Sequence, residues 1–298
     1  MPAPADEFFL DTRRVRAAFD AAAATFDSAA AVHTEIRARL LERLDLVRID
    51  PAVVVDLGAG TGHATRALQG RYSRAQVIAL DVSPAMLHQA RRQQRLLRRF
   101  QRVAGDAQRL PLRDGSADLV FSNLMLQWCD NPDDVFRETR RVLRTGGLLT
   151  FTSLGPDSLR ELRAAWTTID TRTHVHRFID MHDLGDALLR AGFAEPVMDT
   201  ERLTVTYAGL DPLLAELRRS GSTNLALGRR RGLTGAAAGK RFRQAYEAAR
   251  GESAWSLTLE VIYGHAWGTA AGRKLREPQS EAVVPLQQIG RRHSTDIK

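Results

Sequence analysis

Residues 53 to 152 alternate between short apolar runs and amphipathic stretches with helical spacing. Uninterrupted apolar runs are typical of strands buried on both faces, which occur in parallel sheets that helices cover on both sides. The alternation therefore predicts a doubly wound α/β domain. The predicted strands are 53–57, 76–80, 102–104, 117–124 and 148–152, and the predicted helices begin near Ala64, at Ser83-Pro84 and near Pro132, the last running to Arg144 before Gly146-Gly147.

The segments on either side complete the predicted architecture. Apolar residues at helical spacing predict two or three helices within residues 13–47. The later predicted elements are helices at 158–166 and 181–191, strands at 197–207 and 257–263, and a mostly helical insertion at 208–252. The two late strands extend the sheet to seven mostly parallel strands. We therefore expect an N-terminal helical cap (1–50), a domain (51–269) with the insertion as a lid, and a disordered polar tail (270–298).

A glycine-rich turn follows the first predicted strand in the segment VVVDLGAGTG, residues 53–62. Gly58, Gly60 and Gly62 form the pattern GxGxG, whereas a dinucleotide-binding fingerprint requires GxGxxG. Asp56 lies two positions before the first glycine, where a carboxylate can bind an ammonium group. A strand, a glycine turn and a helix allow the backbone to approach a nucleotide-like ligand closely. This combination resembles the first motif of class I S-adenosylmethionine (SAM) methyltransferases, which have a Rossmann-like fold.

Further polar residues follow the next three predicted strands, at the carboxyl ends where open α/β sheets bind ligands. Asp81 ends the second strand, in the position for accepting hydrogen bonds from both ribose hydroxyls. The resemblance implies that Asp106 contacts the adenine amino group, that Ala107 lies near the ring, and that Asn123 lies near the sulfonium. We therefore predict SAM as the cofactor, bound by Asp56, Gly58, Ala59, Gly60, Gly62, Asp81, Val82, Asp106, Ala107 and Asn123.

Four later segments are more family-specific than the glycine motif. They are FTSLGPDSLRELRAAW (151–166), HVHRFIDMHDLGDALLRAGFAEPVMD (174–199), GLTG (232–235) and EVIYGHAWG (260–268). These segments resemble the malonyl-acyl-carrier-protein O-methyltransferases of biotin synthesis. The opening VRAAFDAAAATFDSAA is also similar to that family's N-terminal helix, although Phe26 stands where the family has Tyr. The resemblance covers roughly residues 13–268 and implies methyl transfer to the free carboxylate of a malonyl thioester.

The implied reaction needs no general base, because a carboxylate with a pKa of about 4 is already ionised at pH 7. It needs in-line positioning of a carboxylate oxygen and the exclusion of water. A cation would select malonyl over acetyl, and Arg177 is the first candidate; the alternative is a structural ion pair with Asp180 or Asp183. His174 and His176 are candidates for additional hydrogen bonds. Because a single cysteine and irregular histidine spacing fit no metal site, we predict none.

The chain carries a formal net charge of +8, and arginine supplies almost all of the surplus, because only three lysines are present. The surplus lies in two stretches: 84–113 holds eight Arg against one Asp, and 207–250 holds nine basic against three acidic residues. A basic surface on the lid would steer the strongly acidic acyl carrier protein. The predicted docking residues are Arg229, Arg230, Arg231, Lys240, Arg241 and Arg243. The arginines from 91 to 102 are expected to cover the outside of a helix.

Composition and the remaining patterns limit the other function classes. Cys129 is the single cysteine, so an intrachain disulfide is impossible, and we expect a cytoplasmic protein. No apolar run reaches the roughly eighteen residues of a membrane span, and we expect neither a membrane nor a nucleic acid as a partner. Two enzyme alternatives remain: another SAM-dependent methyltransferase acting on a small carboxylate or quinone precursor, and a relative of the respiratory complex I assembly factor that hydroxylates protein arginine. The late family segments favour the malonyl substrate.

Overall fold

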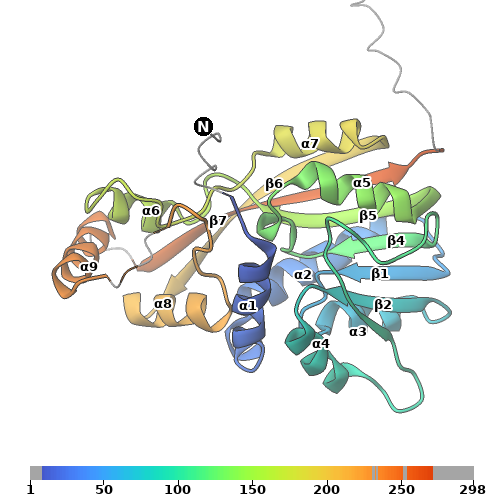
Figure 1. Cartoon of the computed structure of the whole chain (residues 1–298), viewed down its shortest axis with the longest axis horizontal. Helices are drawn as coiled ribbons and strands as arrows, with labels where there is room; N and C mark the ends of the chain where they lie inside the picture. Colours follow the sequence, from blue (N-terminus) through green and yellow to red (C-terminus); the bar gives the residue numbers. More distant parts are fainter. Residues whose placement is uncertain (1–8, 230–231, 233, 251–253, 271–298) are drawn as a thin grey trace, which may run out of the picture.

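The computed structural model describes residues 9–229, 232, 234–250 and 254–270 (Figure 1). Within these residues one sheet of seven strands forms the centre, in the order β3-β2-β1-β4-β5-β7-β6. β1 to β5 pair in parallel, whereas β7 pairs antiparallel with β5 and β6. The doubly wound, mostly parallel sheet is therefore confirmed. The strands are β1 (Val53–Leu57), β2 (Gln76–Asp81), β3 (Gln101–Ala104), β4 (Ala117–Ser122), β5 (Leu143–Leu154), β6 (Phe193–Tyr207) and β7 (Trp255–Gly268).

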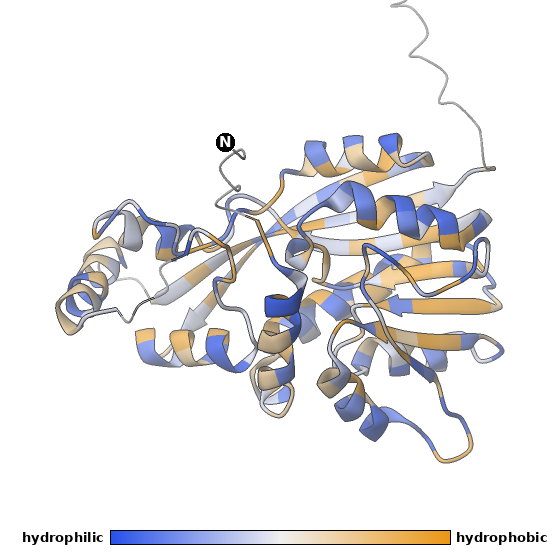
Figure 2. Ribbon diagram, in the orientation of Figure 1, coloured by the Kyte–Doolittle hydropathy of each residue, from blue (hydrophilic) through white to orange (hydrophobic). Residues whose placement is uncertain are grey.

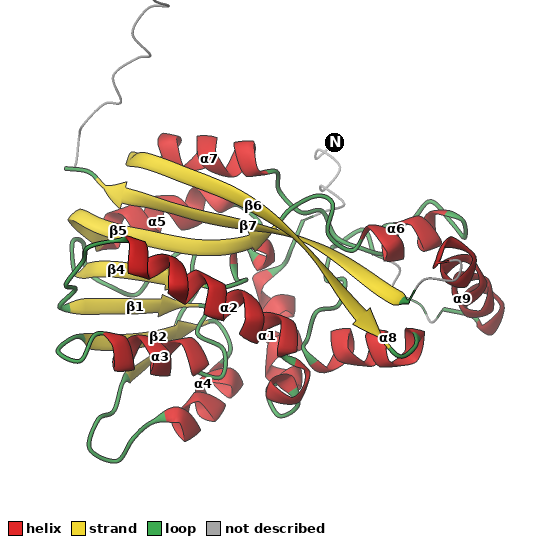
Figure 3. Cartoon of the chain, turned by 180° about the vertical axis from the view of Figure 1, so that it is seen from behind, coloured by secondary structure: helices red, strands yellow, loops and turns green. Residues whose placement is uncertain are grey.

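Helices cover both faces of the sheet (Figures 1 and 3). Those on one face pack Leu40, Leu68 and Leu87 against the central strands, and those on the other contribute Phe136 and Leu188. Figure 2 shows the apolar residues concentrated on the central strands, as expected for a buried parallel sheet. The first face is covered by α2 (Ala31–Arg43), α3 (His63–Arg71) and α4 (Pro84–Ala90), and the second by α5 (Pro132–Val142) and α7 (Met181–Arg190).

Capping side chains fix the starts of two helices that follow strands. Ser83 Oγ accepts a hydrogen bond from the backbone N–H of Met86 at 3.1 Å, and Pro84 occupies the first turn of α4. Asn131 caps α5 in the same way through the N–H of Asp133 at 3.0 Å. These bonds satisfy N–H groups that have no partner within the first turn of a helix. Both helices begin where the sequence predicts them.

The N-terminal segment closes over the carboxyl edge of the sheet. It consists of α1 (Thr12–Ala22), a 3₁₀ turn (Phe26–Ala29) and α2. Asp20 of α1 accepts hydrogen bonds from Ser83 Oγ at 2.6 Å and from the N–H of Ala85 at 3.1 Å. Asp27 accepts one from Thr61 Oγ1 at 2.6 Å. Two carboxylates thus attach this segment to the loops that follow β1 and β2.

β6 and β7 extend beyond the rest of the sheet, and three helices lie around their protruding ends (Figure 1). Phe242 stacks on Trp166 with ring centroids 4.3 Å apart, which joins the insertion to the helix after β5. The insertion is helical, as predicted; its function as a lid stays a prediction. The helices are α6 (Arg160–Thr167), α8 (Leu210–Arg219) and α9 (Ala236–Arg250).

Two local predictions are wrong. The helix predicted to reach Arg144 ends at Val142, and Gly146-Gly147 lie inside β5, because Leu143 already pairs with β4. The arginines from 91 to 102 do not cover a helix: α4 ends at Ala90, and a 3₁₀ turn and a loop lead to β3. The predicted tail lies outside the described residues except for residue 270. None of the helices in the described ranges is long and apolar enough to cross a bilayer.

Candidate active site

The glycine-rich turn leaves β1 at the carboxyl edge of the sheet. Gly58, Gly60 and Gly62 have φ angles of +76°, +53° and +82°, in the left-handed region that favours glycine. A Cβ atom on Gly58 would lie 2.4 Å from Cγ of Met125, and one on Gly62 would lie 2.8 Å from Cβ of Ala90. A Cβ on Gly60 would meet nothing within 4 Å. The loop is therefore closely packed at its ends and open in its middle, where a ligand can approach the backbone.

Asp81 ends β2 beside this loop. Its Oδ2 accepts the backbone N–H of Gly60 at 2.8 Å, and its Oδ1 accepts that of Ser83 at 2.8 Å. Burial raises the pKa of Asp81 to about 6, so the carboxyl group is mostly ionised at pH 7. Each oxygen of an ionised carboxylate has a second lone pair, so the side chain is held in place and can still accept bonds from a ligand.

The ends of β3 and β4 supply the other predicted cofactor residues. Asp106 Oδ1 accepts the backbone N–H of Gln108 at 2.9 Å. Asn123 Oδ1 accepts a bond from Thr152 Oγ1 at 3.0 Å, and its Nδ2 donates to the carbonyl oxygen of His33 at 3.2 Å. Asn123 therefore joins the end of β4 to α2.

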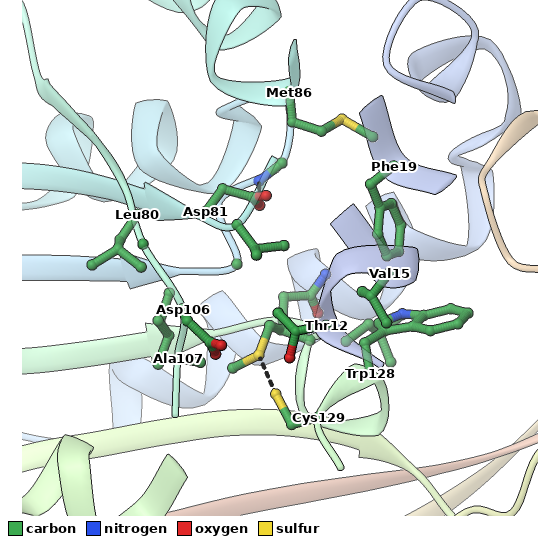
Figure 4. A pocket seen from close by; sticks show the side chains of 18 of the residues that line it. Thr12, Val15, Phe19, Leu80, Asp81, Met86, Asp106, Ala107, Trp128 and Cys129 are labelled. Atoms are coloured by element: carbon green, nitrogen blue, oxygen red, sulfur yellow. Dashed lines mark hydrogen bonds between the residues drawn. The ribbon is translucent and has the colours of Figure 1, made fainter. Parts of the chain in front are cut away.

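These loops line a cavity of about 750 Å³, which we call the glycine-loop cavity (Figure 4). Figure 4 shows the carboxylates of Asp81 and Asp106 on one side and Val15 and Phe19 of α1 on the other. The predicted residues that line it are Gly58, Gly60, Asp81, Val82, Asp106, Ala107 and Asn123. The N-terminal segment adds residues that the sequence did not single out for this site: Thr12, Val15, Phe19, Phe26 and His33.

Three predicted residues, Asp56, Ala59 and Gly62, are not part of this lining. Asp56 is buried, and its Oδ2 accepts a hydrogen bond from Thr65 Oγ1 at 2.5 Å. Burial raises the pKa of Asp56 to about 7. This carboxyl group therefore joins β1 to α3 beneath the loop, and its contact with a cofactor stays a prediction.

A second cavity, of about 610 Å³, adjoins the first; we call it the His176 cavity. The two cavities share His33, Leu124 and Trp128 as lining residues. Most of its wall is apolar, but His33 Nδ1, Gln127 Oε1 and His176 Nε2 are buried without a hydrogen-bond partner in the described part of the chain. Buried polar atoms are normally paired, so such a group of atoms suits a polar ligand.

The two histidines of this cavity are neutral at pH 7. Burial lowers the pKa of His33 to about 4, with a smaller contribution from the charge of Arg37. Burial likewise lowers the pKa of His176 to about 4, and Arg163 adds to the effect. A neutral imidazole carries one N–H donor and one acceptor nitrogen. Each ring can therefore donate one hydrogen bond without carrying a charge.

The other two candidate catalytic residues lie elsewhere. The Nε2 atom of His174 is 2.8 Å from Asp170 Oδ1, and its ring stacks on Trp166 with centroids 3.8 Å apart. Arg177 is exposed and, within the described ranges, forms no ion pair with an acidic residue. Both line an open hollow, which we call the Arg177 hollow and which His176 and Phe178 separate from the His176 cavity by lining both. Of the three predicted side chains, the structure brings His176 alone to the His176 cavity.

The predicted docking residues that the structure describes line neither cavity. Lys240 and Arg241 are exposed on α9, whereas Arg243 pairs with a carboxylate of α8 at 2.5 Å. Arg229 lies in the segment between α8 and α9, and residues 230–231 lie outside the described part of the chain.

Comparison with known proteins agrees with this geometry. Residues 55–151 match a family model described as a methyltransferase domain. A SAM-dependent methyltransferase from Thermotoga maritima superposes with a TM-score of 0.52 at 18% identity, over 85% of this chain and 99% of that one. A Bacillus halodurans protein described as a methyltransferase gives a TM-score of 0.56 at 17% identity, over 78% and 98%. Residues 55–151 therefore match a methyltransferase domain, and the chain shares the fold of these two structures.

Sequence relatives define the family more closely. The malonyl-[acyl-carrier protein] O-methyltransferase of Laribacter hongkongensis is 49% identical over 274 residues, which cover 89% of this chain and 92% of the relative. The protein of the same name from a Methylovorus species is 46% identical over 287 residues, or 94% of each chain. The chain belongs to the malonyl-[acyl-carrier protein] O-methyltransferase family, and the resemblance seen in its late segments is confirmed.

Proposed function

We propose that the protein transfers a methyl group from SAM to the free carboxylate of a malonyl group on acyl carrier protein or coenzyme A. The product is the malonyl methyl ester that enters biotin synthesis. One observation carries the proposal: two adjoining cavities share His33, Leu124 and Trp128 in a chain of this family. A transfer between two bound molecules requires such neighbouring sites, because the reacting atoms must come into contact.

The glycine-loop cavity suits SAM. Asp81 has lone pairs available for the two ribose hydroxyls, and Asp106 can accept the adenine amino group beside Ala107. The open backbone at Gly60 leaves room where a Cβ would meet nothing within 4 Å. Bound SAM supplies a methyl group on a positively charged sulfur. Asp56 remains our candidate for its ammonium group, although it would have to act from beneath the loop.

We assign the acceptor to the His176 cavity. Leu124, Leu154 and Leu257 contribute to its apolar wall and help to exclude water from the reacting atoms. One carboxylate oxygen attacks the methyl carbon, the bond from that carbon to sulfur breaks, and its electron pair stays on the sulfur. The products are a methyl ester and a neutral thioether. No proton moves, so the protein needs no general base for this step.

We propose that His33 and His176 hold the acceptor carboxylate. Both are neutral, His176 is buried and His33 is half-buried, and each has a buried ring nitrogen without a partner among the described residues. Neutral N–H donors orient a carboxylate without the full charge pairing of an arginine, so the attacking oxygen keeps more of its nucleophilic character. An acetyl group would leave these donors unpaired. Arg177 is the weaker candidate for this role, because it is exposed outside both cavities.

The acidic carrier protein is the proposed macromolecular partner. Lys240 and Arg241 are exposed on α9 and offer positive charge that no described residue pairs with, whereas Arg243 is already neutralised. Such charges raise the rate of association more than the final affinity.

A methyl-transfer assay with three acceptors tests the proposed function. We expect turnover with malonyl-carrier protein, slower turnover with malonyl-coenzyme A, and none with acetyl-carrier protein. SAM binding is measured separately by calorimetry, so that a loss of cofactor binding is not mistaken for a wrong acceptor. A folded, SAM-binding protein that methylates neither malonyl substrate would contradict the assignment.

A further inference from the structure

The loop between α4 and β3 carries two leucines at its tip that contact almost nothing. Leu96 is 89% exposed and Leu97 is 101% exposed. This pair follows the arginines that the sequence predicted to cover a helix, in the segment RRQQRLLRRF, residues 91–100. Single exposed leucines are common, but two adjacent ones at a loop tip form an apolar feature that requires an explanation.

The base of this loop is held firmly. A backbone bridge pairs Arg95 with Arg98, and Gln94 Nε2 donates to the carbonyl oxygen of Phe100 at 2.7 Å. The guanidinium of Arg98 donates to the carbonyl oxygen of Tyr72 at 3.1 Å and also contacts that of Ser73. Phe100 is buried. The exposed leucines are therefore presented by an anchored turn.

A collar of positive charge surrounds the tip. Four arginines of the loop are exposed and form no ion pair within the described residues: Arg91, Arg92, Arg95 and Arg99. The stretch 84–113 contains a single acidic residue, Asp106, which lies in the glycine-loop cavity. The collar is therefore not neutralised by its neighbours in sequence.

The tip also lies away from both cavities. It leads into the first residue of β3 and is anchored at the carboxyl end of α3, so it belongs to the edge of the sheet at which the strands begin (Figure 1). The cavities lie at the opposite edge, where β1, β2 and β4 end. A carrier protein docked on this tip would hold its acyl group on the wrong side of the sheet.

We propose that this loop, which we call the leucine tip, binds the surface of a membrane that contains anionic lipids. Apolar residues at the centre of a basic collar fit the boundary between acyl chains and negative headgroups. A protein partner would have to supply a pocket for both leucines, whereas a membrane surface accepts them without one. A nucleic acid would pair with the arginines but would leave both leucines in water. The proposal departs from our expectation that no membrane is a partner, which rested on the absence of a spanning segment.

Co-sedimentation of the full chain with lipid vesicles tests the proposal. We expect binding to vesicles of phosphatidylglycerol and phosphatidylcholine, weakening as salt is raised, and no binding to phosphatidylcholine alone. The double variant Leu96→Ser/Leu97→Ser should reduce binding about tenfold or more. The variant Arg95→Gln/Arg99→Gln should reduce it by roughly twenty-five-fold, at about fivefold for each charge.

Matched controls separate this surface from general charge and apolar exposure. Leu46→Ser removes another leucine that is 86% exposed, and Lys240→Gln/Arg241→Gln removes two exposed charges elsewhere. Both should bind vesicles like the wild type, and methyl transfer to soluble malonyl substrates should be unchanged in the leucine-tip variants. The proposal is overturned if the wild type ignores anionic vesicles or if the serine variant binds them equally well. It is also overturned if the leucines are needed to bind an acidic protein while vesicles are not bound.

Discussion

In the glycine-loop cavity the carboxylate of Asp81 already accepts hydrogen bonds from the backbone of neighbouring loops, whereas in the His176 cavity three buried polar atoms have no partner among the described residues. The first cavity is therefore held in shape by its own hydrogen bonds. The second is formed by segments that are distant in sequence, including α2, residues 176–178 and α8. The comparison teaches that the proposed cofactor site is preorganised, and in our proposal the substrate completes the acceptor site.

This contrast predicts different consequences for mutation. Changes in the glycine-loop cavity should disturb a packed loop and abolish cofactor binding. Changes at residues that line the His176 cavity alone, such as His176, should leave the cofactor site intact and affect the acceptor.

Gly58→Ala should have the largest effect. Its φ is +76°, and its Cβ would lie 2.4 Å from Cγ of Met125. We expect the affinity for SAM to fall by more than about a hundredfold, because the loop must shift by a large fraction of an atomic diameter. Gly60→Ala, where a Cβ meets nothing within 4 Å, should cost less than about tenfold. Calorimetry measures both affinities, and equal losses in the two variants would show that the contact with Met125 is unimportant.

Asp81→Asn should lower the affinity for SAM by roughly thirtyfold, since it replaces the charged acceptor proposed for the two ribose hydroxyls with a neutral amide. The pKa of Asp81 is raised to about 6, so the wild-type carboxyl group is ionised above pH 6 and gains a proton below it. Affinity should therefore fall as the pH is lowered through about 6, approaching tenfold per pH unit. The asparagine variant should lack this dependence. If the SAM affinity of the asparagine variant still falls as the pH is lowered through about 7, the group responsible is Asp56, whose pKa is raised to about 7.

The difference between the cavities also explains what could be predicted from the sequence. Gly58 follows β1 and Asp81 ends β2, two strands whose apolar pattern is unambiguous, so the parallel sheet places them together at one edge. Asp106 follows β3, a short edge strand in which only Val103 and Ala104 are apolar. Asp56 occupies the expected position in the motif, but the sequence does not reveal that its side chain turns toward Thr65.

The acceptor side was less predictable because it depends on tertiary packing. His33 has no motif of its own, and it reaches the cavities because Asp20 and Asp27 dock the N-terminal segment on the loops after β1 and β2. His176 and Arg177 are adjacent in sequence, yet one is buried in the cavity and the other is exposed. In an irregular segment no periodicity indicates which neighbour faces inward. The fold was therefore largely predictable, whereas the donors of the acceptor site were only partly so.

His176→Leu should reduce kcat/KM for malonyl-carrier protein by about tenfold or more, the effect of losing a hydrogen bond to a charged group. His33→Leu should act in the same direction. SAM affinity in His176→Leu should stay within about threefold of the wild type, and His176→Gln, which keeps an N–H donor, should recover part of the activity. His174→Gln is the matched control, because His174 is paired with Asp170 outside both cavities. If His176→Leu lowers only the affinity for SAM, His176 contacts the cofactor and not the acceptor.

The same histidines predict a flat pH profile for the methyl-transfer step between about pH 6.5 and 8. Burial lowers both pKa values to about 4, so neither ring changes its charge in this range. Below pH 6.5 the unfolded chain takes up protons on these rings while the folded protein does not, so the histidine contribution to stability falls from about pH 6.5 toward pH 4. The raised pKa values of Asp56 and Asp81 act in the opposite direction over the same range, so the histidine effect is the difference between the wild type and the variant His33→Leu/His176→Leu. Stopped-flow single turnovers measure the first effect, and urea titrations at several pH values measure the second. A rise in the rate constant centred near pH 6.5 would show that an imidazole titrates in the active site.

Lys240→Gln/Arg241→Gln should raise KM for malonyl-carrier protein about fivefold at low salt and leave KM for malonyl-coenzyme A unchanged. These side chains are exposed on α9 and far from the lining of either cavity, so they can affect the carrier but not the chemical step. The difference should shrink as salt rises. Arg243→Gln, which removes a charge already paired with Asp211, is the matched control and should have a smaller effect. If KM rises equally for malonyl-carrier protein and malonyl-coenzyme A, Lys240 and Arg241 do not form the docking surface for the carrier protein.

Arg177→Met should have the smallest effect, with kcat/KM for malonyl-carrier protein within about threefold of the wild type. From the sequence alone, this arginine is the first candidate for holding the carboxylate. If it had that role, its loss would abolish turnover. The structure places it in the open Arg177 hollow, where water already solvates the guanidinium and a carboxylate would gain little from it. The two histidines inside the cavity meet a desolvated carboxylate instead, and there a hydrogen bond contributes more. If Arg177→Met is inactive while SAM affinity is normal and His176→Leu is active, the hollow and not the His176 cavity receives the malonyl group.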